Sequence, residues 1–333
     1  MKRKNNFKLN LFGIPIINTL DDLSLLTHIT KSTLFRLSKK SYLYYKEYTV
    51  PKKNKGVRKI SQPSAKLKGI QSWILQNILE KLKVSPSCKG FEKGTSTADN
   101  TKPHVGANAI LVVDIKDFYP SIKGNFVFSL FKLIGYNNLI STILTNLCVL
   151  NDSLPQGSPC SPKIANLVAW KLDIRIQSYV GKRGIIYTRY ADDLTFSSIN
   201  PANLIKILPI VKDIIESENF EINKNKTRFI GISRCRKITG LVLSDNNFGV
   251  GKRKYKNIRS KVFKLKDIEK IEDDKEKRKI KEMKEVYGLI AYLKSVDKER
   301  YLRILDYIRT LSVKYPNSIL TNISFNTKTT IAK

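Results

Sequence analysis

The sequence is poor in the residues that bind zinc or form disulfides: its 333 residues include only two histidines, His28 and His104, and four cysteines. The cysteines are Cys88, Cys148, Cys160 and Cys235. They show no paired spacing, and no histidine stands beside them in a ligand pattern. We therefore expect a reduced protein of the cytoplasm, without structural zinc or disulfides.

The sequence also lacks the pattern of a membrane protein. Its longest uncharged stretch, residues 133–151, has the length of a membrane span, but asparagine, serine and threonine interrupt it. No secretory signal or lipidation motif is recognisable. We expect no membrane partner, and we interpret this stretch as buried helix.

Acidic residues are scarce relative to basic ones. The chain has 28 Asp and Glu against 61 Lys and Arg, a formal net charge of +33. Solubility requires a much smaller charge, so a polyanionic ligand such as nucleic acid is indicated. The apolar content of 41% and the chain length allow two or three compact subdomains.

Three aspartates stand out against this basic background. Asp192 and Asp193 close the tetrapeptide Tyr190-Ala191-Asp192-Asp193, between two β-rich segments that predict a hairpin. Asp114 lies 78 residues before Asp192, near the end of an apolar strand predicted over residues 109–115. An Asp-Asp pair alone is usually a solvated turn. Joined by a third carboxylate from a neighbouring strand, the pair could form an oxygen cage for two Mg²⁺ ions, as phosphoryl transfer requires.

The remaining pattern predicts a mixed α+β protein. Apolar spacing predicts helices over residues 20–37, 67–82, within 122–150, after Ser161-Pro162 and over 205–215, and strands over 42–50, 57–60, 185–190, 194–197 and 237–243. From about residue 249 a basic helical module begins. Residues 251–280 carry 13 Lys or Arg and 6 Asp or Glu, with apolar residues interleaved. Such a module fits a solvated helix or a surface that grips nucleic acid.

Four motifs in order give a family resemblance. Asp114 with Tyr119, Leu154-Pro155-Gln156-Gly157, Tyr190-Ala191-Asp192-Asp193 and Asn225-Lys226-Thr227 resemble the successive palm motifs of reverse transcriptases. Two further elements, Asn100-Thr101-Lys102-Pro103-His104 and Ile238-Thr239-Gly240, are similar to elements of bacterial retron reverse transcriptases, with Thr101 and Ile238 as departures.

The resemblance implies a right-hand polymerase fold with fingers, a palm of antiparallel sheet packed on helices, and a helical thumb. The expected parts are an N-terminal helical segment 1–40, fingers 41–108, a palm 109–248 with fingers helices inserted near 122–152, a basic helical thumb 249–316 and a tail 317–333.

The resemblance also implies roles for individual residues. Asp114, Asp192 and Asp193 would bind two Mg²⁺ ions, with Mn²⁺ as an alternative, and Lys226 would protonate the departing pyrophosphate. The nucleotide-binding residues would be Lys53, Arg58, Tyr119, Gln156 and Gly157, with Tyr119 excluding a 2′-hydroxyl. The RNA-binding residues would be Asn100, His104, Thr239, Gly240, Lys252, Arg253 and Lys254, although His104 equally fits a local turn.

The implied function is RNA-directed DNA synthesis on a cognate structured noncoding RNA. Retron enzymes start from an RNA 2′-hydroxyl, leave a branched RNA–DNA product, use dNTPs, and commonly act with an effector protein in antiphage defence. Two alternatives stay open from the residues. One is another polymerase, either of group II intron type or an RNA-dependent RNA polymerase. The other is a noncatalytic RNA-binding scaffold.

Overall fold

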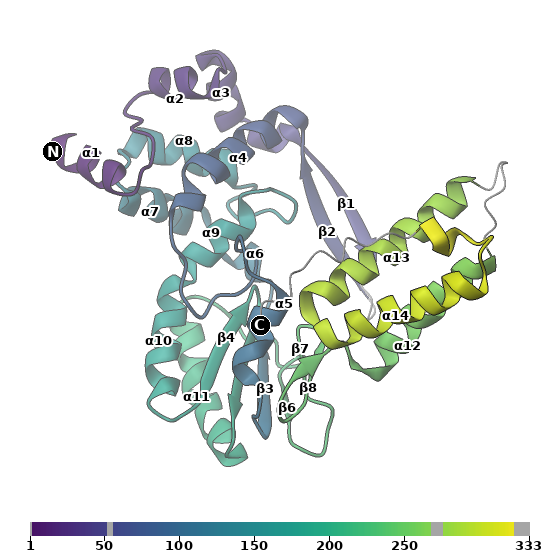
Figure 1. Ribbon diagram of the computed structural model, residues 1–333. Coiled ribbons are helices and arrows are strands. Elements are labelled where there is room, and N and C mark those ends of the chain that lie inside the picture. Colours follow the sequence, from purple (N-terminus) through teal and green to yellow (C-terminus); the bar gives the residue numbers. More distant parts are fainter. Residues whose placement is uncertain (1, 52–55, 268–275, 323–333) are drawn as a thin grey trace. The chain divides into compact units, whose positions relative to one another are not determined.

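The chain folds into two compact units with separate hydrophobic cores. The computed structural model describes residues 2–51, 56–267 and 276–322 (Figure 1). The first unit combines Met1–Thr95 with Ala107–Arg234, and the second combines Ser96–Gly106 with the described residues from Cys235 onward. The second unit therefore begins before the predicted boundary at 249 and takes in a short segment from the predicted fingers.

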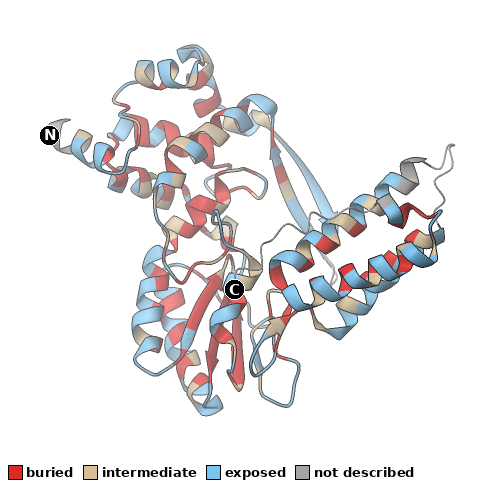
Figure 2. Cartoon of the chain, in the orientation of Figure 1, coloured by how far each residue is buried: buried red, intermediate tan, exposed pale blue. Residues whose placement is uncertain are grey.

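A four-stranded antiparallel sheet, the central sheet, organises the first unit. Its strands in spatial order are β4 (Ile186–Tyr190), β5 (Asp193–Ser198), β3 (Ala109–Asp114) and β6 (Arg228–Ile230). Every residue of β3 is buried, as its unbroken apolar run predicts (Figure 2). Helices α10 (Trp170–Gly181) and α11 (Pro201–Ser217) pack against the sheet (Figure 1). The predicted hairpin is thus present, and β3 lies beside it.

Further helices complete the first unit. They are α1 (Lys2–Leu11), α2 (Leu20–Thr27), α3 (Lys31–Lys39), α4 (Ala65–Asn77), α6 (Phe118–Ser121), α7 (Gly124–Ile134), α8 (Asn138–Cys148) and α9 (Ser161–Val168). The helix predicted over residues 20–37 is in fact two. Helix α2 ends at Thr27 and is followed by the C-cap residue His28, whose φ is 54°, and the side chain of Thr30 caps α3.

A separate two-stranded hairpin, β1 (Tyr45–Pro51) and β2 (Val57–Pro63), also belongs to the first unit. Its strands pair antiparallel, with Val50 opposite Arg58. Its predicted basic tip contains Lys53, which lies outside the described residues.

The second unit is mainly helical. It contains α5 (Thr97–Thr101), α12 (Gly251–Lys264), α13 (Glu276–Val296), α14 (Lys298–Lys314) and a small sheet of β7 (Lys237–Ile238), β8 (Leu241–Leu243) and β9 (Phe248–Gly249). The strand predicted over 237–243 is interrupted because Thr239 and Gly240 have φ values of 44° and 89° and form a tight turn.

Short 3₁₀ segments connect the longer elements: Ser41–Tyr44, Leu79–Lys81, Lys102–His104, Leu265–Asp267 and Ile319–Asn322. None of the helices in the described ranges combines the length and the apolar character needed to cross a bilayer.

Candidate active site

The turn between β4 and β5 brings the acidic residues of the central sheet together. Ala191 has a φ of 56°, which folds the chain sharply between Tyr190 and Asp193. Asp193 lies opposite Asp114 in the β3–β5 register, and the Ile115 amide donates a hydrogen bond to the Asp192 carbonyl at 2.9 Å. The three aspartates predicted from the sequence therefore share one end of the sheet.

These carboxylates carry more negative charge than their surroundings readily accommodate. Burial raises the pKa of Asp193 to about 6, and the charges of Asp192 and Asp114 add to the rise. The pKa of Asp192 is also raised, first by burial and then by the charge of Asp114. Asp114 itself is only 4% exposed. A cation at this end of the sheet would relieve the repulsion.

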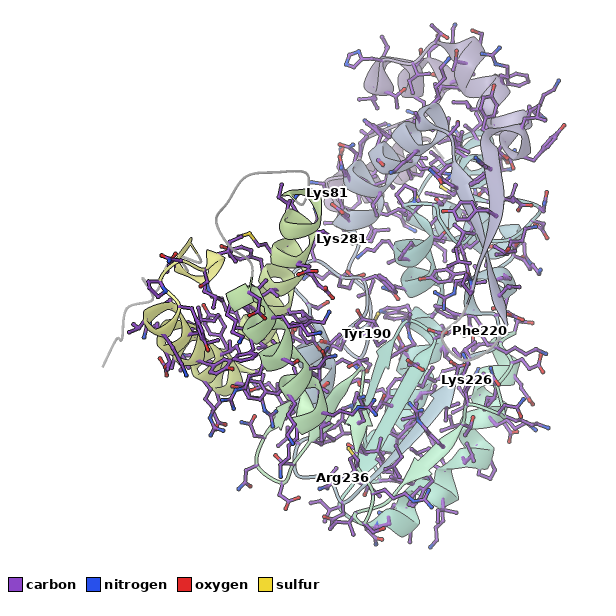
Figure 3. The ribbon with its side chains drawn as sticks, turned by 90° about the vertical axis from the view of Figure 1, so that its right-hand side faces the viewer. Lys81, Tyr190, Phe220, Lys226, Arg236 and Lys281 are labelled. Carbon is purple, nitrogen blue, oxygen red and sulfur yellow. The ribbon has the colours of Figure 1, made fainter. Side chains whose placement is uncertain are left out.

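Lys226 supplies one such cation. Its Nζ lies 2.8 Å and 3.0 Å from the two carboxylate oxygens of Asp114, and this hydrogen bonding raises the pKa of Lys226. Figure 3 labels Lys226 and Tyr190, which belong to the same end of the sheet. Lys226, which the sequence predicts to protonate the departing pyrophosphate, thus forms a direct ion pair with Asp114.

The donor set suits a hard divalent cation, because all three ligands would be carboxylate oxygens. Within the described ranges, no three His, Cys, Asp or Glu side chains are already arranged as a metal site. The ammonium of Lys226 instead neutralises Asp114, and it would have to share this carboxylate with any bound metal ion.

A large cavity of about 890 Å³ opens onto this end of the sheet. Its lining includes the predicted residues Asp114, Asp192, Lys226, Arg58, Tyr119, Gln156 and Gly157, but not Asp193. Tyr119 is half-buried, and burial followed by the charge of Asp192 raises its pKa to about 12. The nucleotide-binding residues predicted within the described part of the chain thus gather around one cavity.

Gly157 is required by the way the β2 strand meets the loop at 154–160. A Cβ on Gly157 would lie 2.5 Å from the Ser61 carbonyl oxygen, and φ is +138°. The Ser61 amide also donates a hydrogen bond to the Gln156 carbonyl at 2.8 Å. The glycine therefore lets the hairpin backbone approach the loop, which fixes Arg58 and Gln156 on the same cavity wall.

A buried ion pair that the sequence did not reveal lies directly behind the Tyr190–Asp193 turn. Arg189 is 0% exposed and binds both oxygens of Asp173, each at 2.7 Å. Burial disfavours the guanidinium charge, but Asp173 outweighs it and raises the pKa of Arg189. Arg189 also donates to the Ala191 carbonyl at 3.2 Å. The buried guanidinium of Arg189 therefore stabilises the turn through a charge-assisted hydrogen bond.

The hydrogen-bond network around Arg189 extends to the segment at residues 87–92. The Lys89 amide donates to the Arg189 carbonyl at 2.8 Å, and Asn166 links Arg189 Nη1 (3.1 Å) to the Gly90 carbonyl (2.7 Å). A Cβ on Gly90 would lie 2.8 Å from the Ala191 nitrogen. A charged residue inside a predicted strand, immediately before Tyr190, was the available sequence signal for this network.

The predicted RNA-binding residues divide into two groups. Asn100 and His104 are both 0% exposed, so their side chains are not available for direct RNA contact in this structure, and that prediction needs correction. Burial lowers the pKa of His104 to about 4, so the ring is neutral at physiological pH. In contrast, Lys252, Arg253 and Lys254 on α12 are all exposed.

The two retron-like elements meet within the second unit. The hydroxyl of Thr101 donates to the Thr97 carbonyl at 2.8 Å and lies 3.3 Å from the hydroxyl of Thr239. Thr239 is half-buried and Gly240 is exposed. Thr101, which departs from the retron element, is thus accommodated by hydrogen bonds that join α5 to the β7–β8 turn.

Comparison with known proteins places this site in a family. Residues 50–243 match the family model of the reverse transcriptases (RNA-dependent DNA polymerases). The retron Ec86 reverse transcriptase of Escherichia coli is 44% identical over 313 residues, which cover 93% of this chain and 95% of that protein. The chain belongs to the retron reverse transcriptases. It is therefore an RNA-directed DNA polymerase that uses an RNA template and nucleotide substrates, in a family that generally uses divalent metal ions.

A second retron reverse transcriptase is less similar to this chain than the Ec86 enzyme. The Mx65 enzyme of Myxococcus xanthus is 28% identical over 315 residues, covering 88% of this chain and 72% of that protein. A solved structure of telomerase from Candida albicans with a fragment of telomeric RNA aligns with a TM-score of 0.42 at 11% identity, over 85% of this chain and 61% of the telomerase chain.

This retron reverse transcriptase has the α+β right-hand polymerase fold, and the central sheet is its palm.

Proposed function

We propose that this chain synthesises DNA in the 890 Å³ cavity, with Asp114, Asp192 and Asp193 holding two Mg²⁺ ions. The observation that carries the proposal is the concentration of carboxylates at one sheet end, where burial and mutual repulsion raise the pKa of Asp192 and Asp193. When bound, the two ions, or Mn²⁺ in their place, would favour attack of a primer hydroxyl on the α-phosphate of a nucleotide.

The side chains around the cavity have distinct parts in this proposal. Arg58 binds the triphosphate, because its planar guanidinium matches phosphate oxygens and it is exposed on the cavity wall. Lys226 stays protonated through its contact with Asp114 and can donate a proton to the departing pyrophosphate. Gln156 and Gly157 support the nucleotide from the loop at residues 154–160, which lies against the hairpin that carries Arg58.

Substitution of one carboxylate tests the site. Asp192→Asn should reduce DNA synthesis on an RNA template with a DNA primer by at least about a thousandfold, since the variant loses a charged metal ligand. Asp117→Asn is the matched control: Asp117 is exposed, has a φ of 46° that asparagine tolerates, and is assigned no metal. Residual synthesis by Asp192→Asn near the wild-type rate would refute the proposed site.

Tyr119 is proposed to select the sugar. Its half-buried ring lines the cavity near Asp192, where it would crowd a ribose 2′-hydroxyl. Tyr119→Ala should therefore raise incorporation of rNTPs relative to dNTPs, measured by competing the two in primer extension. An unchanged ratio would assign the ring to packing alone.

At the level of the biological substrate, we propose that the template is a cognate structured noncoding RNA. Synthesis would start from an RNA 2′-hydroxyl in the cytoplasm and give branched single-stranded DNA that acts with an effector protein in antiphage defence. Support comes from the retron relatives and from the exposed basic residues of α12, which suit RNA phosphates.

The nucleic acid that copurifies with the protein tests this finer proposal. Sequencing should recover one RNA joined to DNA, and a 2′–5′ debranching enzyme should release the DNA from it. Recovery of bulk cellular RNA alone would leave the polymerase assignment standing and overturn the retron priming mechanism for this chain.

A further inference from the structure

Phe91 combines two unfavourable features at the wall of the catalytic cavity. Its side chain is 53% exposed, and its φ is 58°, in the left-handed region that bulky residues rarely adopt. It also lies among the residues that line the cavity. Neither the exposure nor the strained backbone helps the chain to fold, and strained residues of this kind concentrate at functional sites.

The backbone on both sides of Phe91 is held to the catalytic turn. Gly90 fits against Ala191 with no room for a side chain, and its carbonyl accepts a hydrogen bond from Asn166 at 2.7 Å. On the other side, Glu92 pairs with Lys163 at 2.6 Å. The ring of Phe91 lies 5.8 Å from the ring of Tyr190, at an interplanar angle of 44°. The position of the aromatic side chain is therefore set by the same structure that sets the carboxylates.

Phe91 also lines a second, smaller cavity of about 230 Å³. The two cavities share Phe91 and Pro162, so these residues form the border between them. The smaller cavity has apolar walls that include Leu75 and Pro159. Both of its glutamates are neutralised, since Glu80 pairs with Lys93 and Glu92 with Lys163, each at 2.6 Å. Its lining therefore combines flat apolar surfaces with little net charge, which suits a nucleobase.

The order of strands in a template-directed polymerase suggests which strand could reach the smaller cavity. In the proposed site the primer would end at the carboxylates and the incoming nucleotide would lie beside them, whereas the template strand would continue past both. We propose that Phe91 stacks on an unpaired template nucleotide at the border with the smaller cavity. The proposal rests on the proposed location of catalysis in the larger cavity.

Binding of template–primer duplexes that differ only in the unpaired 5′ template overhang tests the proposal. With a fluorescent RNA–DNA duplex, the wild-type protein should bind a four-nucleotide overhang about tenfold more tightly than a blunt end. Phe91→Ala should lose this gain and bind the blunt duplex like the wild type. Phe91→Tyr should retain it, because the aromatic face is kept.

Phe91→Gly separates this role from a structural one. Glycine adopts a φ of 58° without strain, so the thermal midpoint should equal or exceed that of the wild type while the overhang gain is lost. Equal losses on blunt and overhanging duplexes would mean that Phe91 contacts the paired region. Unchanged binding would mean that it contacts no nucleic acid. Either result overturns the proposal.

Asp192→Asn distinguishes failure of this inference from failure of the proposed function. This variant should lose synthesis but keep the overhang gain. Synthesis that survives in Asp192→Asn would refute the catalytic site, whatever the binding of the Phe91 variants. Loss of synthesis in Asp192→Asn, together with an overhang gain that persists in Phe91→Ala, would refute only the template contact.

Discussion

In the first unit the guanidinium of Arg189 is wholly buried and bound by Asp173, whereas in the second unit Lys254 and Arg259 are exposed over aromatic rings. Lys254 Nζ lies 3.9 Å from the ring centre of Tyr292, and Arg259 Cζ lies 4.2 Å from that of Tyr307. A buried charge must be matched by fixed partners, while an exposed charge remains available to a ligand. Basic residues therefore occupy two settings in this chain: Arg189 is buried and hydrogen-bonded to the Tyr190–Asp193 turn, and the exposed cations of α12 belong to the surface that we propose binds nucleic acid.

Removing the buried arginine is the strongest test of this comparison. Arg189→Met leaves the Asp173 carboxylate buried without its cationic partner, so the free energy of unfolding should fall by about 3–5 kcal/mol. Chemical denaturation measures the change. Arg175→Met is the control, because Arg175 is 41% exposed where it pairs with Glu218, and it should cost about 1 kcal/mol or less. Equal losses in the two variants would contradict the distinction between buried and exposed pairs.

The fit of Gly90 behind the turn should give the next largest effect. Gly90→Ala places a Cβ 2.8 Å from the Ala191 nitrogen, so the backbone must shift at a cost of about 1–3 kcal/mol, with slower DNA synthesis. Gly69→Ala is the matched control. Gly69 lies within α4 with nothing within 4 Å of the added Cβ, and alanine there should stabilise by about 0.5–1 kcal/mol. Thermal unfolding and primer extension measure both, and an equal response at the two glycines would refute the close fit.

His104 introduces a titratable group into the interior of the second unit. Its pKa falls from 6.5 to about 4 on folding because burial disfavours the charged ring. The free energy of unfolding is therefore at its full value above about pH 6.5. It falls as the pH drops towards 4, because the unfolded chain takes up the proton at a higher pH than the folded chain. Between pH 7.5 and 5 the wild type should lose about 2 kcal/mol relative to His104→Gln. Parallel denaturation of both proteins measures this difference, and identical pH slopes would show that the histidine is accessible to solvent.

The exposed cations should have the smallest effect on stability and a clear effect on binding. Lys254→Gln and Arg259→Gln should each change the free energy of unfolding by no more than about 1 kcal/mol. Each should weaken RNA binding and reduce the salt dependence of log K by about 0.7–1. Lys212→Gln on α11, a control outside the second unit, removes an exposed lysine paired with Glu216 at 3.6 Å and should leave binding unchanged. An unchanged salt slope in both α12 variants would contradict a phosphate-binding role.

The sequence predicted the candidate site best where an apolar pattern or the order of the motifs marked the residues directly. The apolar run before Asp114 predicted a buried strand, and the order of the motifs predicted which carboxylates would meet. Composition could not reveal the partners of Arg189, because Asp173 lies 16 residues away on a helix and nothing local links the two. Asn100 and His104 were assigned to RNA binding by their similarity to a retron element, yet the fold buries both side chains. His28 has a left-handed (αL) backbone conformation that divides one predicted helix into two. Apolar spacing, on which the prediction of that helix rested, carries no signal for this conformation.

The segment 96–106 separates the two parts of the first unit along the chain, so the polypeptide crosses between the units three times, near residues 95, 106 and 234. No single cut can divide the protein into intact halves. Ending the chain at residue 234 would leave α5 without the β7–β8 turn, whereas an isolated piece from 235 onward would lack Thr101 and its hydrogen bonds. To transfer the second unit to another polymerase, both of its sequence segments, 96–106 and the part from 235 onward, must therefore be grafted. A fusion at one junction would carry an incomplete fold.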